Sequence, residues 1–212
     1  MQLEKYKKEY EEKGITVIPN VFTEEECEMM KKAAYATRPG DIVGAGYPHS
    51  PSEAAKNKLS LIFFPALTGN YLNDVRTDER MQEIVRYFLG DDVKQVNNQI
   101  YFREAGDEDE FAWHQDICFR TPSNRFPGIK DGYLQTIIAV DDITEDNGAI
   151  EFVPGTHREV TKYGRPSVKR GLRNFNREGI RGEKYKAPKG SVLLWTCLTL
   201  HGSEANTSES IA

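Results

Sequence analysis

The sequence has 212 residues, of which 38% are hydrophobic, and its 28 basic and 33 acidic side chains give a net charge of -5. This composition is typical of a globular protein and not of a disordered chain. A chain of this length can form a stable core without disulfides. The negative net charge provides no general basic field for nucleic acid or an anionic membrane, so we expect neither partner.

The cysteine content and the hydropathy pattern predict a cytoplasmic protein. Cys27, Cys118 and Cys197 form an odd set without a C-x-x-C pair, which favours a reducing compartment. The N-terminus alternates charges where a signal peptide would be apolar. The longest apolar run, residues 61–67, is far too short to cross a bilayer.

The first ninety residues carry mainly helical patterns. Residues 3–13 predict a charged surface helix, and Thr23 with Glu26 forms a capping box that begins a second helix. A third amphipathic helix is expected over 78–89, where a glycine follows its last residue. Between the first two helices, the β-branched residues of 15–21 predict a short strand.

After residue 90 the pattern changes to short apolar or alternating runs separated by Gly, Pro, Asn and Asp. This pattern indicates an antiparallel sandwich or barrel. The expected strands are 93–102, 134–140, 149–153 and 191–200. Asn147-Gly148 predicts a hairpin turn, because both residue types accept positive φ. We therefore expect a mostly β protein with flanking α-helices, forming one domain over 1–212, in which residues 1–90 pack on a core of 91–212.

Three residues predict a metal site. Residues i and i+2 of a strand project from the same face, so His114 and Asp116 can approach one ion together. His201 follows the apolar run 191–200 and supplies a second imidazole. Two histidines and one carboxylate form the facial triad of non-haem Fe(II) oxygenases, although zinc also accepts these ligands.

Three sequence blocks occur together in the order of a known family. They are Trp113-His114-Gln115-Asp116, the segment from Ile138 to His157, and the segment from Leu200 to Asn206. In these blocks the chain resembles the phytanoyl-CoA dioxygenase family of Fe(II)/2-oxoglutarate-dependent oxygenases. The resemblance implies a double-stranded β-helix, which is a jelly-roll, cupin-like barrel, either complete or without its last strand, with the N-terminal helices outside it.

The resemblance also implies roles for individual residues. His114, Asp116 and His201 would be the catalytic iron ligands, with 2-oxoglutarate as cosubstrate and O₂ as oxidant. Ser203 matches the family position that touches a 2-oxoglutarate carboxylate, and Gln99 lies about where the family places a side chain over the cosubstrate.

The family has an arginine, about 11 residues after the second histidine, that binds the far carboxylate of 2-oxoglutarate. That position is Ala212, the last residue of the sequence. We expect the arginine to lie beyond residue 212. Two other interpretations stay open: another residue does its work, or cosubstrate binding is impaired.

The implied activity is hydroxylation of an unactivated C–H bond of a small metabolite, with decarboxylation of 2-oxoglutarate to succinate. Related halogenases have a small residue at the position of Asp116, so the aspartate favours a hydroxylase. We expect a small-molecule substrate and a monomer or weak homodimer. The alternatives are a cupin-like enzyme without redox chemistry and a metal-binding jelly-roll domain without oxygenase activity.

Residues close to the motif could line a substrate pocket. The candidates are Trp113, Phe119, Arg120 and the loop at 47–49, which contains His49. Arg120 could bind an anionic group of the substrate, although an exposed arginine more often pairs with Asp or Glu. His157 lies at a turn, where we expect it to bond backbone groups, and Trp195 is expected in the core.

Overall fold

The computed structural model describes residues 2–37, 61–63, 66, 69–106, 108, 110–120, 128–129, 132–162 and 179–210, with only the backbone described at 61–63. His49, the irregular segment around it and Ala212 lie outside these ranges. The helices are α1 (Glu4–Lys13), α2 (Glu24–Ala36), α4 (Tyr71–Arg76) and α5 (Glu79–Leu89). The sequence therefore places its three expected helices correctly, and the capping box of Thr23 and Glu26 is present.

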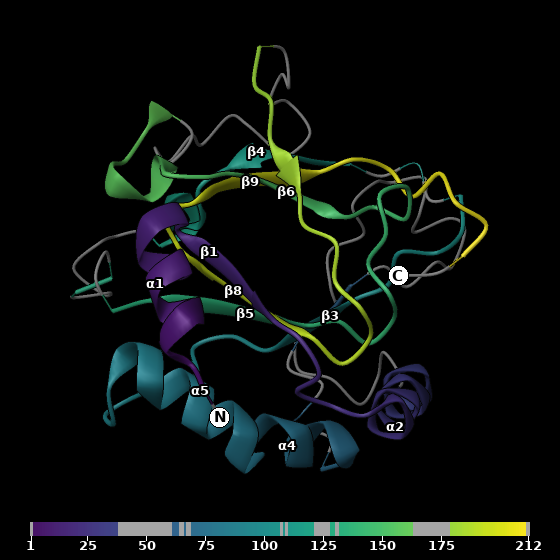
Figure 1. The fold of residues 1–212 in the computed structure, drawn as a ribbon. Coiled ribbons are helices and arrows are strands. Elements are labelled where there is room, and N and C mark those ends of the chain that lie inside the picture. Colours follow the sequence, from purple (N-terminus) through teal and green to yellow (C-terminus); the bar gives the residue numbers. More distant parts are fainter. Residues whose placement is uncertain are drawn as a thin grey trace.

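The strands form two larger sheets that face each other (Figure 1). The first has the order β1 (Ile15–Ile18), β8 (Val192–Thr196) and β5 (Leu134–Ile138). The second has the order β4 (Phe111–His114), β9 (Leu200–Ser203), β6 (Ile150–Val153) and β7 (Glu183–Lys184). A separate pair joins β2 (Leu61–Phe63) to β3 (Gln99–Tyr101). All of these pairings are antiparallel.

The three-stranded sheet packs on helices on one side and faces the four-stranded sheet on the other. Figure 1 shows α4 and α5 across its outer side and α1 at one end. The outer apolar cluster combines strand residues such as Val192 and Leu194 with helix residues such as Ile84. The inner cluster contains Leu193 and Trp195 of the same strand. The two-residue period of β8 therefore separates the two layers of core.

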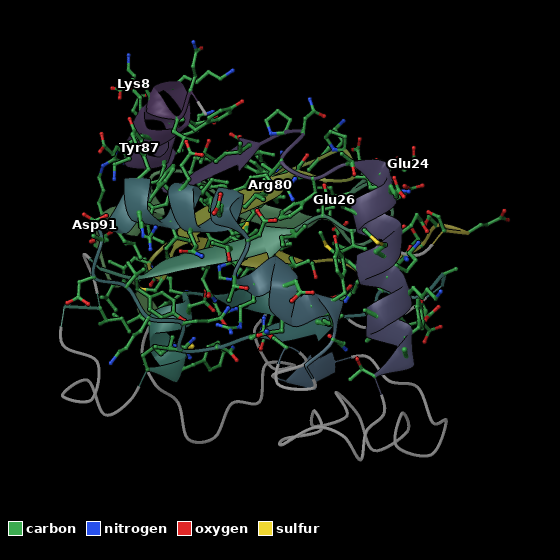
Figure 2. All side chains as sticks on the ribbon, turned by 90° about the horizontal axis from the view of Figure 1, so that it is seen from below. Lys8, Glu24, Glu26, Arg80, Tyr87 and Asp91 are labelled. Atoms are coloured by element: carbon green, nitrogen blue, oxygen red, sulfur yellow. The ribbon has the colours of Figure 1, made fainter. Side chains whose placement is uncertain are left out.

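A charged cluster attaches α5 to α2 at the edge of the outer layer. Arg80 donates to both carboxylate oxygens of Glu26 at 3.0 and 2.6 Å, and also to Asp78 at 2.8 Å. Its guanidinium lies 4.4 Å from the centre of the Phe22 ring. Figure 2 shows Arg80 and Glu26 side by side between the two helices. These contacts fix the helical layer in place.

Two strand predictions are wrong, and tertiary pairing explains both. The run 191–200 is two strands, because residues 197–199 turn and carry the chain from β8 to β9 in the opposite sheet. Only Gln99–Tyr101 of the run 93–102 is a strand. Strand 15–21 is also shorter than expected, ending at Ile18. The N-terminal part of the chain nevertheless contributes β1 to the core sheet.

The predicted hairpin at Asn147-Gly148 is also wrong. The strands on either side of it, β5 and β6, lie in different sheets and do not pair. Gly148 has a φ of 85°, but Asn147 does not adopt positive φ. Instead Asn147 is buried, accepts a hydrogen bond from the Thr144 amide at 2.8 Å and donates one to the Asp142 carbonyl at 2.6 Å. Its side chain therefore stabilises a connection between sheets.

Among the described residues, no helix is both long enough and apolar enough to span a membrane.

Candidate active site

The three predicted metal ligands meet between the two sheets. β4 ends at His114, which lies opposite His201 of β9 in the antiparallel register. Asp116 Oδ1 lies 3.7 Å from His114 Nε2, and Asp116 Oδ2 lies 3.7 Å from His201 Nε2. One ligand atom from each of the three buried residues lies within 4.8 Å of the other two. The structure therefore brings together the residues that the sequence singled out.

Asp116 differs from its predicted position in one respect. It does not continue the strand but begins a short 3-10 helix, η3 (Asp116–Phe119). Its side chain still reaches both histidines, at 3.7 Å from each, while Gln115 between the ligands bonds other parts of the chain. Gln115 is fully buried, donates to the Glu159 carbonyl at 2.9 Å and accepts from the Thr161 amide at 2.8 Å. These bonds anchor the turn that carries the carboxylate.

Both histidines are oriented by backbone carbonyls. His114 Nδ1 lies 2.7 Å from the Ala112 carbonyl oxygen, and His201 Nδ1 lies 2.8 Å from that of Thr199. A carbonyl only accepts, so each Nδ1 must carry the proton and donate. Each Nε2 then has a free lone pair directed to the common point. Such backbone partners are typical of metal-bound histidines.

The charges of the site also suit a cation. Burial, and next the nearby His201, lower the pKa of His114 to about 4, so this imidazole is neutral at pH 7. Burial alone would raise the pKa of Asp116, but the two histidines and two hydrogen bonds outweigh it and lower the pKa overall. A buried carboxylate that stays ionised beside imidazole nitrogens provides a negative charge that a divalent cation can neutralise.

Two residues that orient Asp116 were not predicted as site residues. Gln135 of β5 donates to Asp116 Oδ2 at 2.9 Å, and Trp195 of β8 donates to the same oxygen at 3.2 Å. Gln135 is the only amide side chain in β5, where Leu134, Ile137 and Ile138 are apolar, and this is a detectable sequence signal. Trp195 is buried as expected, but nothing in its sequence context distinguishes it from a purely structural core residue.

Aromatic rings enclose the histidines on several sides. Phe152 stacks on His201 with ring centres 5.7 Å apart, and the Trp195 ring lies 5.4 Å from His201. Phe119 contacts His114 edge-on at 5.5 Å, but 45% of Phe119 is exposed. The triad therefore has a closed apolar side at Phe152 and Trp195, and a solvent-facing side at Phe119.

The two expected cosubstrate residues lie on different strands. Ser203 is buried on β9, two residues after His201, and its strand position places it on the same face as that histidine. Gln99 on β3 is half-buried, accepts from Asn97 at 2.9 Å and donates to the Tyr101 hydroxyl at 2.5 Å. The Tyr101 ring packs at 5.4 Å against Phe111, which pairs with Ser203.

The other histidines and the candidates for the substrate pocket lie in different parts of the structure. Trp113 is fully buried, and its ring lies against Gly182, where a Cβ would come within 2.5 Å of it. His157 Nε2 lies 3.1 Å from the Glu11 carbonyl oxygen, which confirms the expected backbone role. His49 lies outside the described residues. Phe119 and Arg120 lie at the solvent-facing side of the triad.

The donor set fits Fe(II). Two imidazole nitrogens and one carboxylate, all buried and close to one another, are the ligand types of the non-haem iron triad. The same atoms also accept zinc in a site that retains water. Ligand chemistry therefore defines a divalent metal site, and family membership decides which enzyme class uses it.

Curated relatives match almost the whole chain. A probable alpha-ketoglutarate-dependent hypophosphite dioxygenase of Stutzerimonas stutzeri is 27% identical over 215 residues, covering 95% of this chain and 72% of the relative. The ectoine dioxygenase of Bordetella bronchiseptica is 24% identical over 220 residues, covering 94% of this chain and 69% of the relative. Both relatives are longer than the present chain.

Solved structures share the fold. The crystal structure of EctD from S. alaskensis with 2-oxoglutarate and 5-hydroxyectoine has a TM-score of 0.79 and 21% identity, covering 98% of this chain and 72% of that one. The carbocyclase SnoK from nogalamycin biosynthesis has a TM-score of 0.72 and 20% identity, covering 98% and 79%. These similarities confirm the predicted jelly-roll fold class, although the described residues form two facing sheets without complete closure.

The model of one protein family covers nearly the full sequence. Residues 10–212 match the family described as phytanoyl-CoA dioxygenase. The matched range includes all three candidate ligands, so the site described above and the family agree. The chain therefore belongs to the phytanoyl-CoA dioxygenase family, which confirms the expected class of Fe(II)- and 2-oxoglutarate-dependent dioxygenases.

Proposed function

We propose that the protein hydroxylates an unactivated C–H bond of a small molecule while 2-oxoglutarate is decarboxylated to succinate. The observation that carries the proposal is the buried triad of His114, Asp116 and His201, whose two imidazoles are fixed with Nε2 free. Relatives that are named dioxygenases for ectoine and hypophosphite support a small substrate.

His114, Asp116 and His201 would hold the iron. Iron with 2-oxoglutarate and O₂ supplies the oxidation: one oxygen atom goes to the substrate and the other to succinate, with release of CO₂. The protein's part is to keep three ligands in one orientation and to exclude water from the reacting side. The carbonyl partners of the histidines, the two donors to Asp116 and the packed rings of Phe152 and Trp195 support that role.

Ser203 and Gln99 are proposed to contact 2-oxoglutarate. Ser203 lies on the same strand face as His201, so its hydroxyl can approach a carboxylate of a metal-bound cosubstrate. Gln99 bonds Asn97 and Tyr101, so the amide would have to exchange one of these partners to contact the cosubstrate. The family position of the carboxylate-binding arginine, Ala212, lies outside the described residues.

A carboxylate at position 116 favours hydroxylation over halogenation. Asp116 fills a ligand position that a halide would need, and its second oxygen is already bound by Gln135 and Trp195.

We also propose that residues 1–212 act as one domain in the cytoplasm, as a monomer or weak homodimer. The pairing of β1 with β8 supports one domain, and three free cysteines support a reducing compartment.

The proposal is tested by anaerobic titration of the protein with Fe(II) and 2-oxoglutarate. We expect the weak visible charge-transfer band of the iron chelate, and its loss in His114→Ala and Asp116→Ala. His157→Ala is the matched control, because this histidine bonds the Glu11 carbonyl away from the triad and should keep the band.

Two results of this titration would contradict the proposal. If metal binds but no band forms, the site serves a cupin-like reaction without redox chemistry or a non-catalytic binding role. If the band survives in both triad variants, the iron is held elsewhere. Release of succinate that depends on O₂ and a substrate separates an active dioxygenase from a domain that only binds the cosubstrate.

A further inference from the structure

We propose that the substrate carries a small oxyanion, a carboxylate or a phosphonate, and that Arg120 and Tyr133 bind it at the solvent-facing side of the metal site. The inference rests on the proposed function, because it assigns a substrate class to that site. It identifies Arg120 and Tyr133 as a pair that selects the substrate without touching the metal.

The position of Arg120 places it at the entrance to the site. It directly follows η3, four residues after Asp116, and is half-buried. Its neighbour Phe119 packs edge-on against the His114 ring at 5.5 Å and is 45% exposed. The turn from 116 to 120 therefore runs from the candidate metal ligand to the solvent-exposed surface, and it passes beside the His114 ring.

Tyr133 comes from a different element but faces the same side. It lies two residues before Gln135, and alternate residues of an extended chain share a face. Gln135 reaches Asp116 at 2.9 Å, so that face is the one toward the metal site. Arg120 Nε donates to the Tyr133 hydroxyl at 3.1 Å, and Arg120 Nη2 donates to the same oxygen.

This pair leaves donors available for an anion. Arg120 uses Nε and one N–H of Nη2 on Tyr133, and a guanidinium has further N–H groups on Nη1 and Nη2. The phenol accepts both bonds, so its own O–H remains a donor. No carboxylate forms an ion pair with Arg120 within the described part of the chain. Within the described residues, the guanidinium is therefore fixed by a neutral partner and forms no ion pair with a carboxylate.

A fixed guanidinium beside a hydroxyl matches an oxyanion. Two N–H groups of arginine match two oxygens of a carboxylate or phosphonate, and a hydroxyl can add a third bond. The Tyr133 ring lies 5.1 Å from the Arg120 guanidinium carbon, which further restricts the side chain before ligand arrives. Such preorganisation lowers the cost of binding.

The experiment uses ligand-observed NMR with propionate, ethylphosphonate and the uncharged propionamide as probes. The protein is loaded with Zn(II), a redox-inert substitute for iron, with and without 2-oxoglutarate. We expect saturation transfer to at least one of the two anions and not to propionamide. Arg120→Gln should weaken anion binding about tenfold, because hydrogen bonds to a charged group are lost. The exposed Arg86→Gln, on α5, is the matched control and should change nothing.

Further variants separate recognition from a purely structural role. Tyr133→Phe keeps the ring and removes the hydroxyl, so it should lower the affinity for the anions by a smaller factor than Arg120→Gln does. Arg120→Lys keeps the charge and should recover part of the affinity that Arg120→Gln loses. If propionate binds more tightly than ethylphosphonate, the substrate carries a carboxylate; if ethylphosphonate binds more tightly, it carries a phosphonate.

Three outcomes would overturn the proposal. Equal binding of the anions to Arg120→Gln and the original protein would show that Arg120 only supports the turn. Binding of propionamide as tight as that of the anions would show that the site does not recognise the negative charge. A loss of 2-oxoglutarate affinity in Arg120→Gln, with the probes unaffected, would assign the arginine to the cosubstrate. None of these measurements needs catalytic turnover. Failure of the proposed function, which the Fe(II) titration tests, would therefore be recognised separately.

Discussion

The two faces of the three-stranded sheet serve different purposes. On the outer face, Val192 and Leu194 of β8 pack against apolar helix residues such as Ile84. On the inner face, Trp195 of the same strand packs with Phe152 and donates to Asp116. One strand therefore contributes to stability on one side and to the metal site on the other, because its side chains alternate.

The comparison shows that buried polar groups are concentrated where chemistry is expected. The outer layer is almost wholly apolar, with its charged cluster of Glu26, Asp78 and Arg80 at the edge. The inner layer buries a carboxylate and two imidazoles, each with hydrogen-bond partners. Changes on the outer face should reduce the free energy of unfolding, and changes on the inner face should reduce metal binding.

The largest effect is expected for Asp116→Ala on the inner face. Removal of the only carboxylate of the triad should reduce Fe(II)-dependent succinate formation to background. The free energy of unfolding should change by less than about 2 kcal/mol. The donors of Gln135 and Trp195 lose their acceptor, which destabilises the protein, but the cost of burying a charge is also removed. Urea unfolding and a coupled succinate assay measure the two quantities. Retained turnover would remove Asp116 from the ligand set.

Ile84→Ala tests the outer face. Ile84 is fully buried between α5 and the sheet, so its truncation should lower the free energy of unfolding by about 2 to 5 kcal/mol. Fe(II) affinity, measured at low temperature where the variant stays folded, should be unchanged. The exposed Arg86→Ala on the same helix is the control and should be nearly neutral. A large loss of metal affinity would show that the faces are coupled.

Trp195→Phe tests the link between core packing and the site. The variant keeps an aromatic ring but loses the N–H that donates to Asp116 Oδ2 at 3.2 Å. Fe(II) affinity should fall by about 10- to 100-fold, as is typical for partners of metal ligands. Trp113→Phe is the matched control, since Trp113 is also fully buried but points toward Gly182. Equal losses in both variants would indicate a packing effect only.

Glu26→Gln is expected to have the smallest effect. The hydrogen bond from Arg80 lowers the pKa of Glu26 from 4.5 to about 2, and the two side chains are 22% and 34% exposed. Solvent screening reduces the resulting stabilisation to about 1 to 2 kcal/mol at pH 7. Because the folded pKa is lowered, this stabilisation is present above pH 4.5 and is lost as the pH falls toward 2.

The pH dependence supplies its own control. The difference in unfolding free energy between Glu26→Gln and the unmodified protein should be constant near pH 7 and should shrink below pH 4.5. Fe(II) binding at pH 7 should not change, because Glu26 lies on α2 on the outer side of the sheet. A difference that does not depend on pH would mean that packing, and not charge, is lost.

Local sequence signals predicted helices α1, α2 and α5 well, but they did not fix the bounds of the strands. The capping box at Thr23 and the glycine after α5 act within one turn of helix, so no distant residue is needed to detect them. The run 191–200 has a continuous apolar composition, but its two halves pair in different sheets, so composition alone predicts one strand. The turn at 197–199 is defined by which sheet each half joins.

The sequence by itself determined the family and singled out the candidate metal ligands, because His114, Asp116 and His201 lie in blocks whose order and spacing are specific. Only the tertiary structure decided what surrounds them. Gln135 and Trp195 come from two strands far apart in sequence, and Tyr133 approaches Arg120 only when β5 packs beside η3. Short-range patterns fix which residues alternate on a strand, but contacts between strands depend on how the sheets pair and face each other.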